Sequence, residues 1–375
     1  MSRREKREAE ENAKKGKKSV LKIIFILLLL IIIIGGISIF AWYELSLKPV
    51  EEGNSQSIII DIVPGQGTEG IASALKENNL IKDDLVFKIY CKLNEVNNMQ
   101  AGTYELNKNM SVEEIVKKFQ AGDVVIKEIN VTFQEGKNMR DIAKIISENT
   151  NNSYEDVMKV FEDKEYAKGL IEEYWFLTDE ILDNNIYYPL EGYLYPDTYT
   201  FESVDVSIDD IIKIMLDQTD KVLSEYQIEI KSKGYTVHQF LSLASVVENE
   251  GISTEDRKGI AKVFLNRIER GMALQSDVTT YYAFKVNMGD RDLTQSELNT
   301  ANPYNTRGPN MEGKIPVGPI SNVSESAIEA TLNPSDTDAI FFVADKNGKI
   351  YFSNTNEEHE QIINELKSQG LWYTY

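Results

Sequence analysis

The sequence predicts an α+β protein with one N-terminal transmembrane helix, a small α/β module and a larger mixed α+β domain. Three observations support this prediction. An uncharged apolar segment of twenty residues lies near the N-terminus, strand-like and helix-like apolar patterns alternate after it, and the chain has 375 residues. Because a domain typically takes roughly 150 residues, this length suits about two domains.

Charge and composition argue against several kinds of function. The formal net charge is −20, which argues against nucleic acid because phosphate binding needs a clustered basic surface. Cys91 is the only cysteine, so a metal site built from thiolates is excluded. The only histidines, His238 and His359, argue against a multi-histidine zinc site and a metallopeptidase. We therefore expect no metal and no cofactor.

Residues 23–42 are predicted to form the transmembrane helix. Twenty uncharged residues span about 30 Å as a helix, the hydrocarbon thickness of a bilayer. The alternative is a cleaved signal peptide, but a small-residue cleavage site should then follow, whereas Trp42, Tyr43 and Glu44 follow here. Residues 1–22 carry nine Lys and Arg against four Glu. This basic tail predicts a single-pass protein of the cell membrane with a cytoplasmic N-terminus and an extracytoplasmic remainder.

A polar linker is expected at residues 43–57, followed by a small module at residues 58–130. The module begins with a strand-like run at residues 58–63, and Thr68 can cap the helix after it. A second helix is predicted over residues 84–93.

A third helix of this module has defined ends, because Ser111 and Glu114 form a capping box before it and Gly122 stops it. The order strand, glycine turn and helix occurs at Gly65 and again at Gly136. At this scale the pattern resembles LysM-like modules, which hold cell-wall glycans. An ordinary α+β connection explains the same residues equally well.

The second domain is predicted at residues 131–375. It starts with a strand and a helix that buries Ile142 and Ile146, and an acidic helical region follows at residues 150–185.

A tyrosine-rich loop follows at residues 188–199, where two prolines and a glycine prevent a regular helix. Its rings, including Tyr193 and Tyr195, are suited to stack on sugar rings. A packed loop at a domain junction is the alternative, and composition alone favours it.

The helix predicted at residues 236–250 ends in two carboxylates. Glu248 lies on the apolar stripe of Leu241 and Ala244, while Glu250 follows another apolar line, so periodicity alone does not choose between them. Residues two apart on a helix point about 200° apart around its axis. The two glutamates therefore cannot flank one glycosidic bond as the acid and nucleophile of a conventional hydrolase. If one is catalytic, it works without the other as a direct partner.

A further helix is predicted at residues 254–270, with Ser253 and Asp256 as its capping box. Asn266 and Arg267 lie late in it, where the expected role is to cap backbone carbonyls.

Several motifs after the membrane segment resemble those of one family. They are AGTYEL (101–106), EGYLYPDTY (191–199), ASVVENE (244–250), FLNRIERGMALQSDVTTYY (264–282), NPYNTRG (302–308), IPVGPISN (315–322) and FFVAD (341–345). In this order they closely resemble the endolytic murein transglycosylases, the YceG-like family. The resemblance covers nearly everything after the membrane segment.

The resemblance implies that Glu248 is the catalytic residue. It also implies a set of substrate-binding residues: Tyr193, Tyr195, Gln275, Ser276, Asp277, Tyr304, Asn305 and Thr306. Three positions depart from the family pattern, namely Val278, Arg307 and Ile350, and the departures leave Glu248 untouched.

The activity implied is that of a membrane-anchored, endolytic peptidoglycan lytic transglycosylase, which is a lyase. Glu248, in an apolar pocket, would protonate the glycosidic oxygen of the β-1,4 bond between MurNAc and GlcNAc. It would then take the proton of the MurNAc C6 hydroxyl, which closes a 1,6-anhydro ring. Cleavage of nascent strands would terminate glycan elongation beside glycan polymerases such as penicillin-binding proteins.

Two other functions stay open at this point. A non-catalytic peptidoglycan-binding scaffold of the synthesis machinery would use the small module and the tyrosine-rich loop. A muramidase-type hydrolase would use Asp277 as an additional carboxylate and leave reducing ends.

Overall fold

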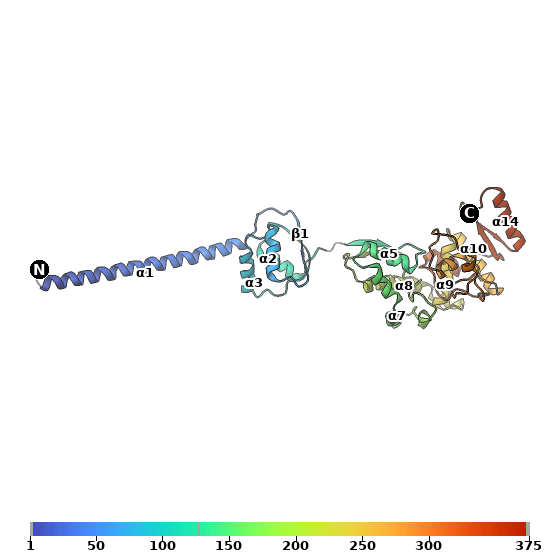
Figure 1. Ribbon diagram of the computed structural model, residues 1–375, viewed down its shortest axis with the longest axis horizontal. Coiled ribbons are helices and arrows are strands. Elements are labelled where there is room, and N and C mark those ends of the chain that lie inside the picture. Colours follow the sequence, from blue (N-terminus) through green and yellow to red (C-terminus); the bar gives the residue numbers. More distant parts are fainter. Residues whose placement is uncertain (1–2, 126–127, 373–375) are drawn as a thin grey trace. The chain divides into compact units, whose positions relative to one another are not determined.

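The computed structural model describes the backbone of residues 3–125 and 128–372, and the side chains within these ranges except those of residues 3–21, 23 and 24. The described residues form two compact units, which divide between residues 127 and 128; Figure 1 shows their elements. Helices are combined with two-stranded antiparallel sheets. The predicted mixture of helix and strand is confirmed.

Helix α1 (Arg3–Leu47) contains the predicted membrane segment. Its stretch Phe25–Leu47 has a mean hydropathy of 2.9 and is long and apolar enough to cross a membrane. Its large apolar side chains are exposed, as a lipid-facing helix requires. The helix runs on to Leu47, into the range predicted as a linker. The basic side chains that predict the orientation lie, apart from Lys22, outside the described side chains.

The remainder of the first unit is a small β-α-α-β arrangement with one more helix. Strand β1 (Ile58–Ile62) pairs antiparallel with β2 (Gly102–Leu106), and α2 (Thr68–Glu77) and α3 (Asp84–Leu93) lie between them in the chain. Helix α4 (Val112–Ala121) follows. All of these elements contribute to one apolar core.

The helix ends of this unit follow the predicted caps in one case and not in the other. Ser111 and Glu114 form the predicted capping box of α4, and Gly122 ends the helix with a φ of 66°. In α2 the N-cap is Gly67, so Thr68 is the first helical residue and not the predicted cap.

The second unit begins with strand β3 (Ile129–Thr132), which pairs antiparallel with β4 (Thr198–Phe201). Gly136, with a φ of 71°, turns the chain into α5 (Met139–Asn149). The strand starts at Ile129, so it begins within the range predicted for the first module.

The acidic region predicted as helical is divided into short elements: α6 (Tyr154–Glu162), α7 (Lys164–Ile171) and the 3-10 helix η1 (Asp179–Leu182). Asp163 causes the first break, because its side chain accepts hydrogen bonds from the backbone N–H groups of Glu165 and Tyr166. These bonds start a new helix instead of continuing the old one.

The rest of the second unit surrounds one central helix, α9 (Val237–Glu250), which packs against α8, α10, α11 and α13. Figure 1 shows α8, α9 and α10 next to one another in the ribbon. The other elements are α8 (Ile208–Ser232), α10 (Thr254–Glu269), α11 (Asp277–Ala283), α12 (Gln295–Leu298), α13 (Glu325–Leu332), the hairpin of β5 (Phe341–Ala344) and β6 (Ile350–Ser353), and α14 (Asn356–Ser368).

Gly192 holds a tight turn in the tyrosine-rich loop. Its φ is 84°, and a Cβ at this position would overlap the ring of Pro319. Gly234 has the same φ of 84° but open space around it. We predict that Gly192→Ala lowers the free energy of unfolding by about 2 kcal/mol more than Gly234→Ala, because only the first adds overpacking to backbone strain. Urea unfolding of both variants measures this difference, and equal losses would contradict the predicted overlap.

Candidate active site

Helix α9 brings both candidate carboxylates to its C-terminal turn. Thr236 and Gln239 form a capping box at its start, and its end is followed directly by Gly251. Nearly every side chain between Phe240 and Glu248 is buried, so the position of the last turn is fixed on all sides by packing.

Glu248 is fully engaged by neighbouring protein groups. Its side chain is 4% exposed, and Arg257 Nη2 lies 2.6 Å from its Oε1. Ser324 donates twice to Oε2, from its backbone N–H at 2.9 Å and from Oγ at 2.5 Å. Ser324 is also the N-cap of α13. Glu248 therefore ties α9 to α10 and α13.

The expectation of an apolar pocket around Glu248 is wrong. Hydrophobic periodicity correctly predicts that this side chain is buried, but the carboxylate itself contacts a guanidinium, a hydroxyl and a backbone N–H. A buried carboxylate needs such partners, because an unpaired charge in the interior is strongly unfavourable.

Glu250 has a different environment, although it lies only two residues further along. It lines a cavity of about 490 Å³ together with Gln275, Asp277 and Arg307. Ser276 Oγ donates to Glu250 Oε1 at 2.5 Å. Burial raises the pKa of the Glu250 carboxyl to about 7, and the charge of Asp277 acts in the same direction against the lowering effects of Ser276 and Arg307. The C-terminal end of α9 also disfavours a negative charge here.

In the predicted segment of Gln275, Ser276 and Asp277, the first and last residues line this cavity, and Ser276 lies between them in the chain. Gln275 has a φ of 57°, which turns the chain into α11. Asp277 is the first residue of α11, and Arg307 Nη1 lies 2.9 Å from its Oδ1. The start of a helix stabilises an anionic side chain. The exposed Asp277 therefore lies where a negative charge is favoured, at a helix start and beside Arg307, whereas Glu250 lies at a helix end, where a negative charge is disfavoured.

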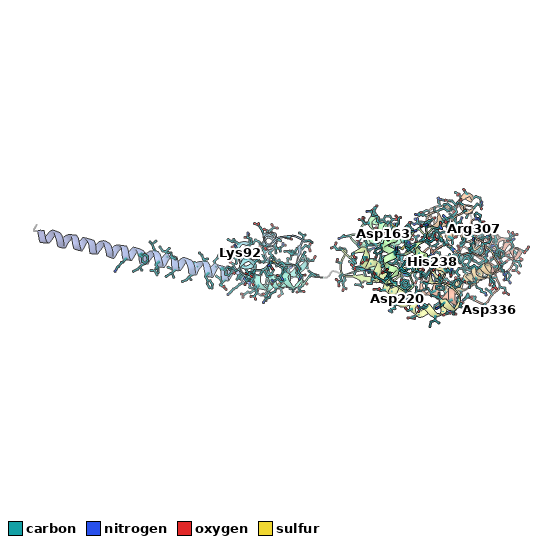
Figure 2. The ribbon with its side chains drawn as sticks, turned by 90° about the horizontal axis from the view of Figure 1, so that it is seen from below. Lys92, Asp163, Asp220, His238, Arg307 and Asp336 are labelled. Carbon is teal, nitrogen blue, oxygen red and sulfur yellow. The ribbon has the colours of Figure 1, made fainter. Side chains whose placement is uncertain are left out.

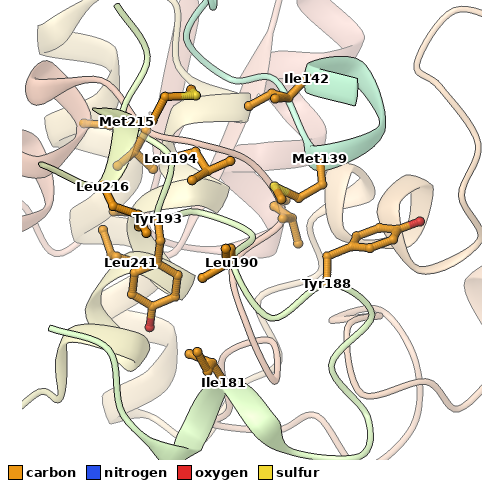
Figure 3. Close-up of a cluster of buried hydrophobic side chains, with 14 of the residues drawn as sticks. Met139, Ile142, Ile181, Tyr188, Leu190, Tyr193, Leu194, Met215, Leu216 and Leu241 are labelled. Carbon is orange, nitrogen blue, oxygen red and sulfur yellow. The ribbon is translucent and has the colours of Figure 1, made fainter. Parts of the chain in front are cut away.

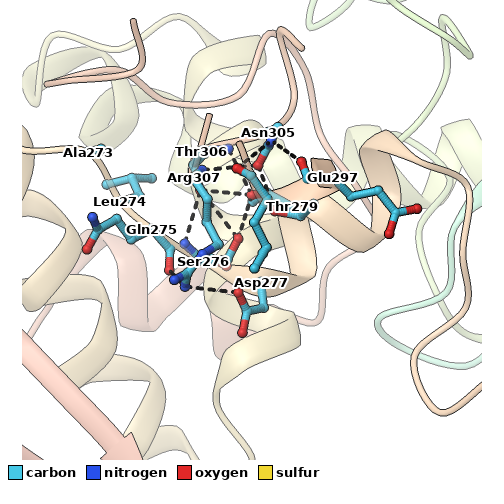
Figure 4. Close-up of polar contacts among 12 residues, drawn as sticks. Ala273, Leu274, Gln275, Ser276, Asp277, Thr279, Glu297, Asn305, Thr306 and Arg307 are labelled. Carbon is cyan, nitrogen blue, oxygen red and sulfur yellow. Dashed lines mark hydrogen bonds and ion pairs between the residues drawn. The ribbon is translucent and has the colours of Figure 1, made fainter. Parts of the chain in front are cut away.

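Asn305 and Thr306 support Ser276 and α11 from the side away from the cavity. Both are fully buried, and Figure 4 shows their contacts. Thr306 Oγ1 accepts a hydrogen bond from the backbone N–H of Ser276 at 3.1 Å, and Asn305 Oδ1 accepts one from Thr280 Oγ1 at 2.6 Å. These residues position Ser276 and α11 and do not face the cavity.

The three predicted tyrosines lie away from the cavity. Tyr193 is fully buried, its hydroxyl is 2.9 Å from His238 Nδ1, and its ring stacks on His238 and Phe176. Figure 3 shows Tyr193 in the core, and Figure 2 marks His238. Tyr304 is likewise fully buried, and Tyr195 is half-buried. The ring of Tyr193 packs against protein, as the alternative explanation of the loop expects. The ring of Tyr304, outside that loop, packs against Tyr187 and Tyr282.

Glu191, in the same loop, is a buried carboxyl that the sequence analysis did not single out. It accepts hydrogen bonds from the backbone N–H of Met139 at 3.1 Å and from the hydroxyl of Tyr282 at 2.9 Å. Burial raises the pKa of Glu191 to about 8, although both hydrogen bonds lower it. It joins the start of α5 to α11.

Further residues of the cavity come from the C-terminal hairpin and α14. The ring of His359 stacks on Phe341, with ring centres 5.1 Å apart, and the Arg267 guanidinium lies 5.2 Å from the centre of the Phe341 ring. Arg267 also donates to the carbonyls of Leu274 and Ile340. Arg267 therefore fixes backbone on two sides of the cavity. The expectation that it caps the carbonyls of its own helix is wrong, because these acceptors lie outside α10. In the sequence, His359 stands out only as one of the two histidines and Phe341 only as part of the FFVAD motif, and neither pattern predicts a role in a binding site.

The cavity thus combines one carboxyl with a pKa near neutrality, one carboxylate paired to an arginine, and amide and aromatic groups. A group with a pKa near the working pH is suited to donate and accept protons in one reaction. Comparison with known proteins assigns the chain to a family. A model of the YceG-like family matches residues 60–365. The chain belongs to the YceG-like family.

Curated relatives of this YceG-like protein share one name. The protein from Bacillus subtilis called "Endolytic murein transglycosylase" is 37% identical over 329 residues, which cover 88% of this chain and 89% of that protein. A protein of the same name from Streptococcus pneumoniae is 33% identical over 352 residues, or 90% of this chain and 63% of that protein. The crystal structure of a YceG-like protein from Listeria monocytogenes is 37% identical, with a TM-score of 0.59 over 82% of this chain and 99% of that chain.

The contacts of Glu248 predict that this YceG-like protein needs it for stability. We expect Glu248→Gln to lower the free energy of unfolding by about 3 kcal/mol, because Arg257, whose side chain is 12% exposed, loses its partner. Glu255→Gln is the matched control, since Glu255 pairs with Lys258 but is 80% exposed; we expect a loss of at most about 0.5 kcal/mol. Denaturant titrations measure both, and equal effects would contradict the structural role.

Proposed function

We propose that this protein is a membrane-anchored, endolytic lytic transglycosylase of peptidoglycan. The observation that carries the proposal is Glu250, a carboxyl with a pKa of about 7 that lines a cavity large enough for part of a glycan strand. The names of the curated relatives support the substrate. The bond cleaved is the β-1,4 bond between MurNAc and GlcNAc, and the products end in 1,6-anhydroMurNAc.

In the proposed reaction Glu250 is the single acid and base. Its protonated carboxyl donates the proton to the glycosidic oxygen, and the bond from that oxygen to C1 of MurNAc breaks. The resulting carboxylate accepts the proton of the MurNAc C6 hydroxyl as this oxygen bonds to C1. Glu250 gives up one proton and accepts one, so it ends the reaction protonated again and no water is consumed. General acid–base catalysis of this kind contributes on the order of 10² to 10⁴ in rate.

Glu250 takes the catalytic role that the sequence analysis gave to Glu248. Glu248 lines none of the cavities described, and both of its oxygens are bound to protein groups. Glu250 lies in the cavity with one hydrogen bond from Ser276. Gln275 and Asp277, which line the same cavity, are proposed to bind substrate, while Ser276, Asn305 and Thr306 position them.

The N-terminal third of the chain is proposed to keep the enzyme near its substrate. The apolar stretch of α1 would anchor the chain with its N-terminus in the cytoplasm. The β-α-α-β arrangement of the first unit supports a LysM-like, glycan-holding role for that module. Nascent strands and their polymerases are then the expected partners, and cleavage would end strand elongation.

A second candidate is hydrolysis, because Asp277 lines the same cavity as Glu250. In that reaction Asp277 would assist an attack by water or act as nucleophile, and the product would carry a reducing end.

The products of the full-length protein in H₂¹⁸O distinguish these reactions. We predict anhydro-ended fragments without ¹⁸O in the mass spectrum of digested glycan strands. Reducing ends that contain ¹⁸O would replace the proposal by hydrolysis. Strands that stay uncleaved at every enzyme concentration would leave the non-catalytic scaffold as the remaining function.

The pH dependence of cleavage tests the proton on Glu250. The rate should fall as the pH rises through about 7, because the carboxyl must be protonated to act as the acid. Asp277→Asn removes a charge that raises the pKa of Glu250, so the falling limb should move to lower pH. Glu312→Gln, an exposed carboxylate outside the cavity, is the control and should leave the limb in place. A limb that is unmoved in Asp277→Asn would contradict this assignment.

A further inference from the structure

A second cavity lies next to the one that contains Glu250. We propose that it binds a carboxylate carried by a muramoyl residue beside the cleaved bond, and this inference rests on the proposed function. The cavity measures about 200 Å³ and is lined by the start of α5, by α11 and by residues 286–288. This is smaller than a typical site for a whole small ligand, so it suits one substituent of a longer chain.

The two cavities are lined by consecutive residues of the same two helices. On α9, Asn249 lines the second cavity and Glu250 lines the first. On α11, Val278 lines the second and Asp277 the first. Consecutive Cα atoms are about 3.8 Å apart. We therefore infer that a polymer whose bond lies at Glu250 places its neighbouring groups at the second cavity.

The charge of the second cavity favours an anion. Lys137 and Arg140 both line it, against one carboxylate, Asp141. Among the side chains that the structure describes, neither cation forms an ion pair with a carboxylate. Arg140 Nη1 donates to the carbonyl of Lys285 at 2.6 Å, while its buried Nε has no hydrogen-bond partner.

The ligand would be held by side chains and not by the start of α5. The first N–H groups of that helix are already used, since Met139 donates to Glu191 and both Arg140 and Asp141 donate to Asn138 Oδ1. Asp141 is itself occupied as part of the capping box. Lys137 is free to form a charge-assisted hydrogen bond, which is the stronger class of such bonds.

Peptidoglycan offers this carboxylate from two sources. A muramoyl residue with its peptide stem carries carboxylates on the stem, whereas its lactyl group is an uncharged amide. A residue without a stem carries the free lactyl carboxylate. Both place a carboxylate on a short flexible arm beside the sugar ring, and an experiment can separate them.

The test compares the full-length wild type with Lys137→Gln in detergent micelles. Three substrates are digested: strands with stems, strands freed of stems by an amidase, and amidase-treated strands whose lactyl carboxylates are converted to methyl amides. We expect Lys137→Gln to raise KM about tenfold on one or both carboxylate-bearing substrates, with kcat nearly unchanged, and to leave KM unaffected on the amide. A loss on stem-bearing strands alone assigns the stem, and a loss on stem-free strands alone assigns the lactyl group.

Lys144→Gln is the matched control, because Lys144 lies on α5 as well but outside this cavity. It should leave KM within about twofold of wild type, since its removal affects only exposed charge. An unchanged KM in Lys137→Gln on both carboxylate-bearing substrates, or an equal rise on the amide, overturns the inference while cleavage by the wild type upholds the proposed function. Absence of cleavage by the wild type overturns both.

Discussion

The hydrogen bond from Ser276 Oγ to Glu250 Oε1, 2.5 Å long, is the contact on which the candidate site depends. It joins the last residue of α9 to the residue before α11. Around it, the packing of α9 fixes one side, and Thr306 fixes the other by accepting from the backbone of Ser276. The cavity therefore has a defined shape because two well-held segments meet at a single carboxyl.

The helical geometry of α9 divides two tasks between two glutamates. Because Glu248 and Glu250 point about 200° apart, one can close the interior while the other faces a cavity. Glu248 binds Arg257 and the N-cap residue of α13, Ser324, and both contacts are made by its carboxylate oxygens. Glu250 is half-buried and has no cationic hydrogen-bond partner among the described side chains, and desolvation raises its pKa to about 7. The same two-residue spacing that forbids a carboxylate pair thus permits a stable scaffold beside a proton donor.

Much of the local structure could be predicted from the sequence. The capping box of Ser111, the box of Ser253 and the bounds of α3 agree with the structure because they depend on neighbouring residues alone. The choice between the two glutamates could not be made in this way. It depends on Arg257, Ser324 and Ser276, and only the last of these lies in a segment that the sequence analysis connected with substrate. The role of Asn305 and Thr306 behind the cavity wall, and the core position of Tyr193, likewise depend on contacts between distant segments.

The same limit applies to charge. Periodicity predicts that Glu248 is buried, but it carries no information on whether a buried carboxyl is paired or has a raised pKa. Glu191 illustrates this, because nothing in its sequence surroundings indicates the burial that raises its pKa to about 8.

The most direct test of the account compares the cleavage rates of Glu250→Gln and Glu248→Gln, each expressed per folded molecule and measured at a temperature where both are folded. The account predicts that Glu250→Gln loses a factor of about 10² to 10⁴ in rate with little loss of stability, whereas Glu248→Gln is less stable but cleaves within about tenfold of wild type. An active Glu250→Gln, or a folded and inactive Glu248→Gln, would contradict it.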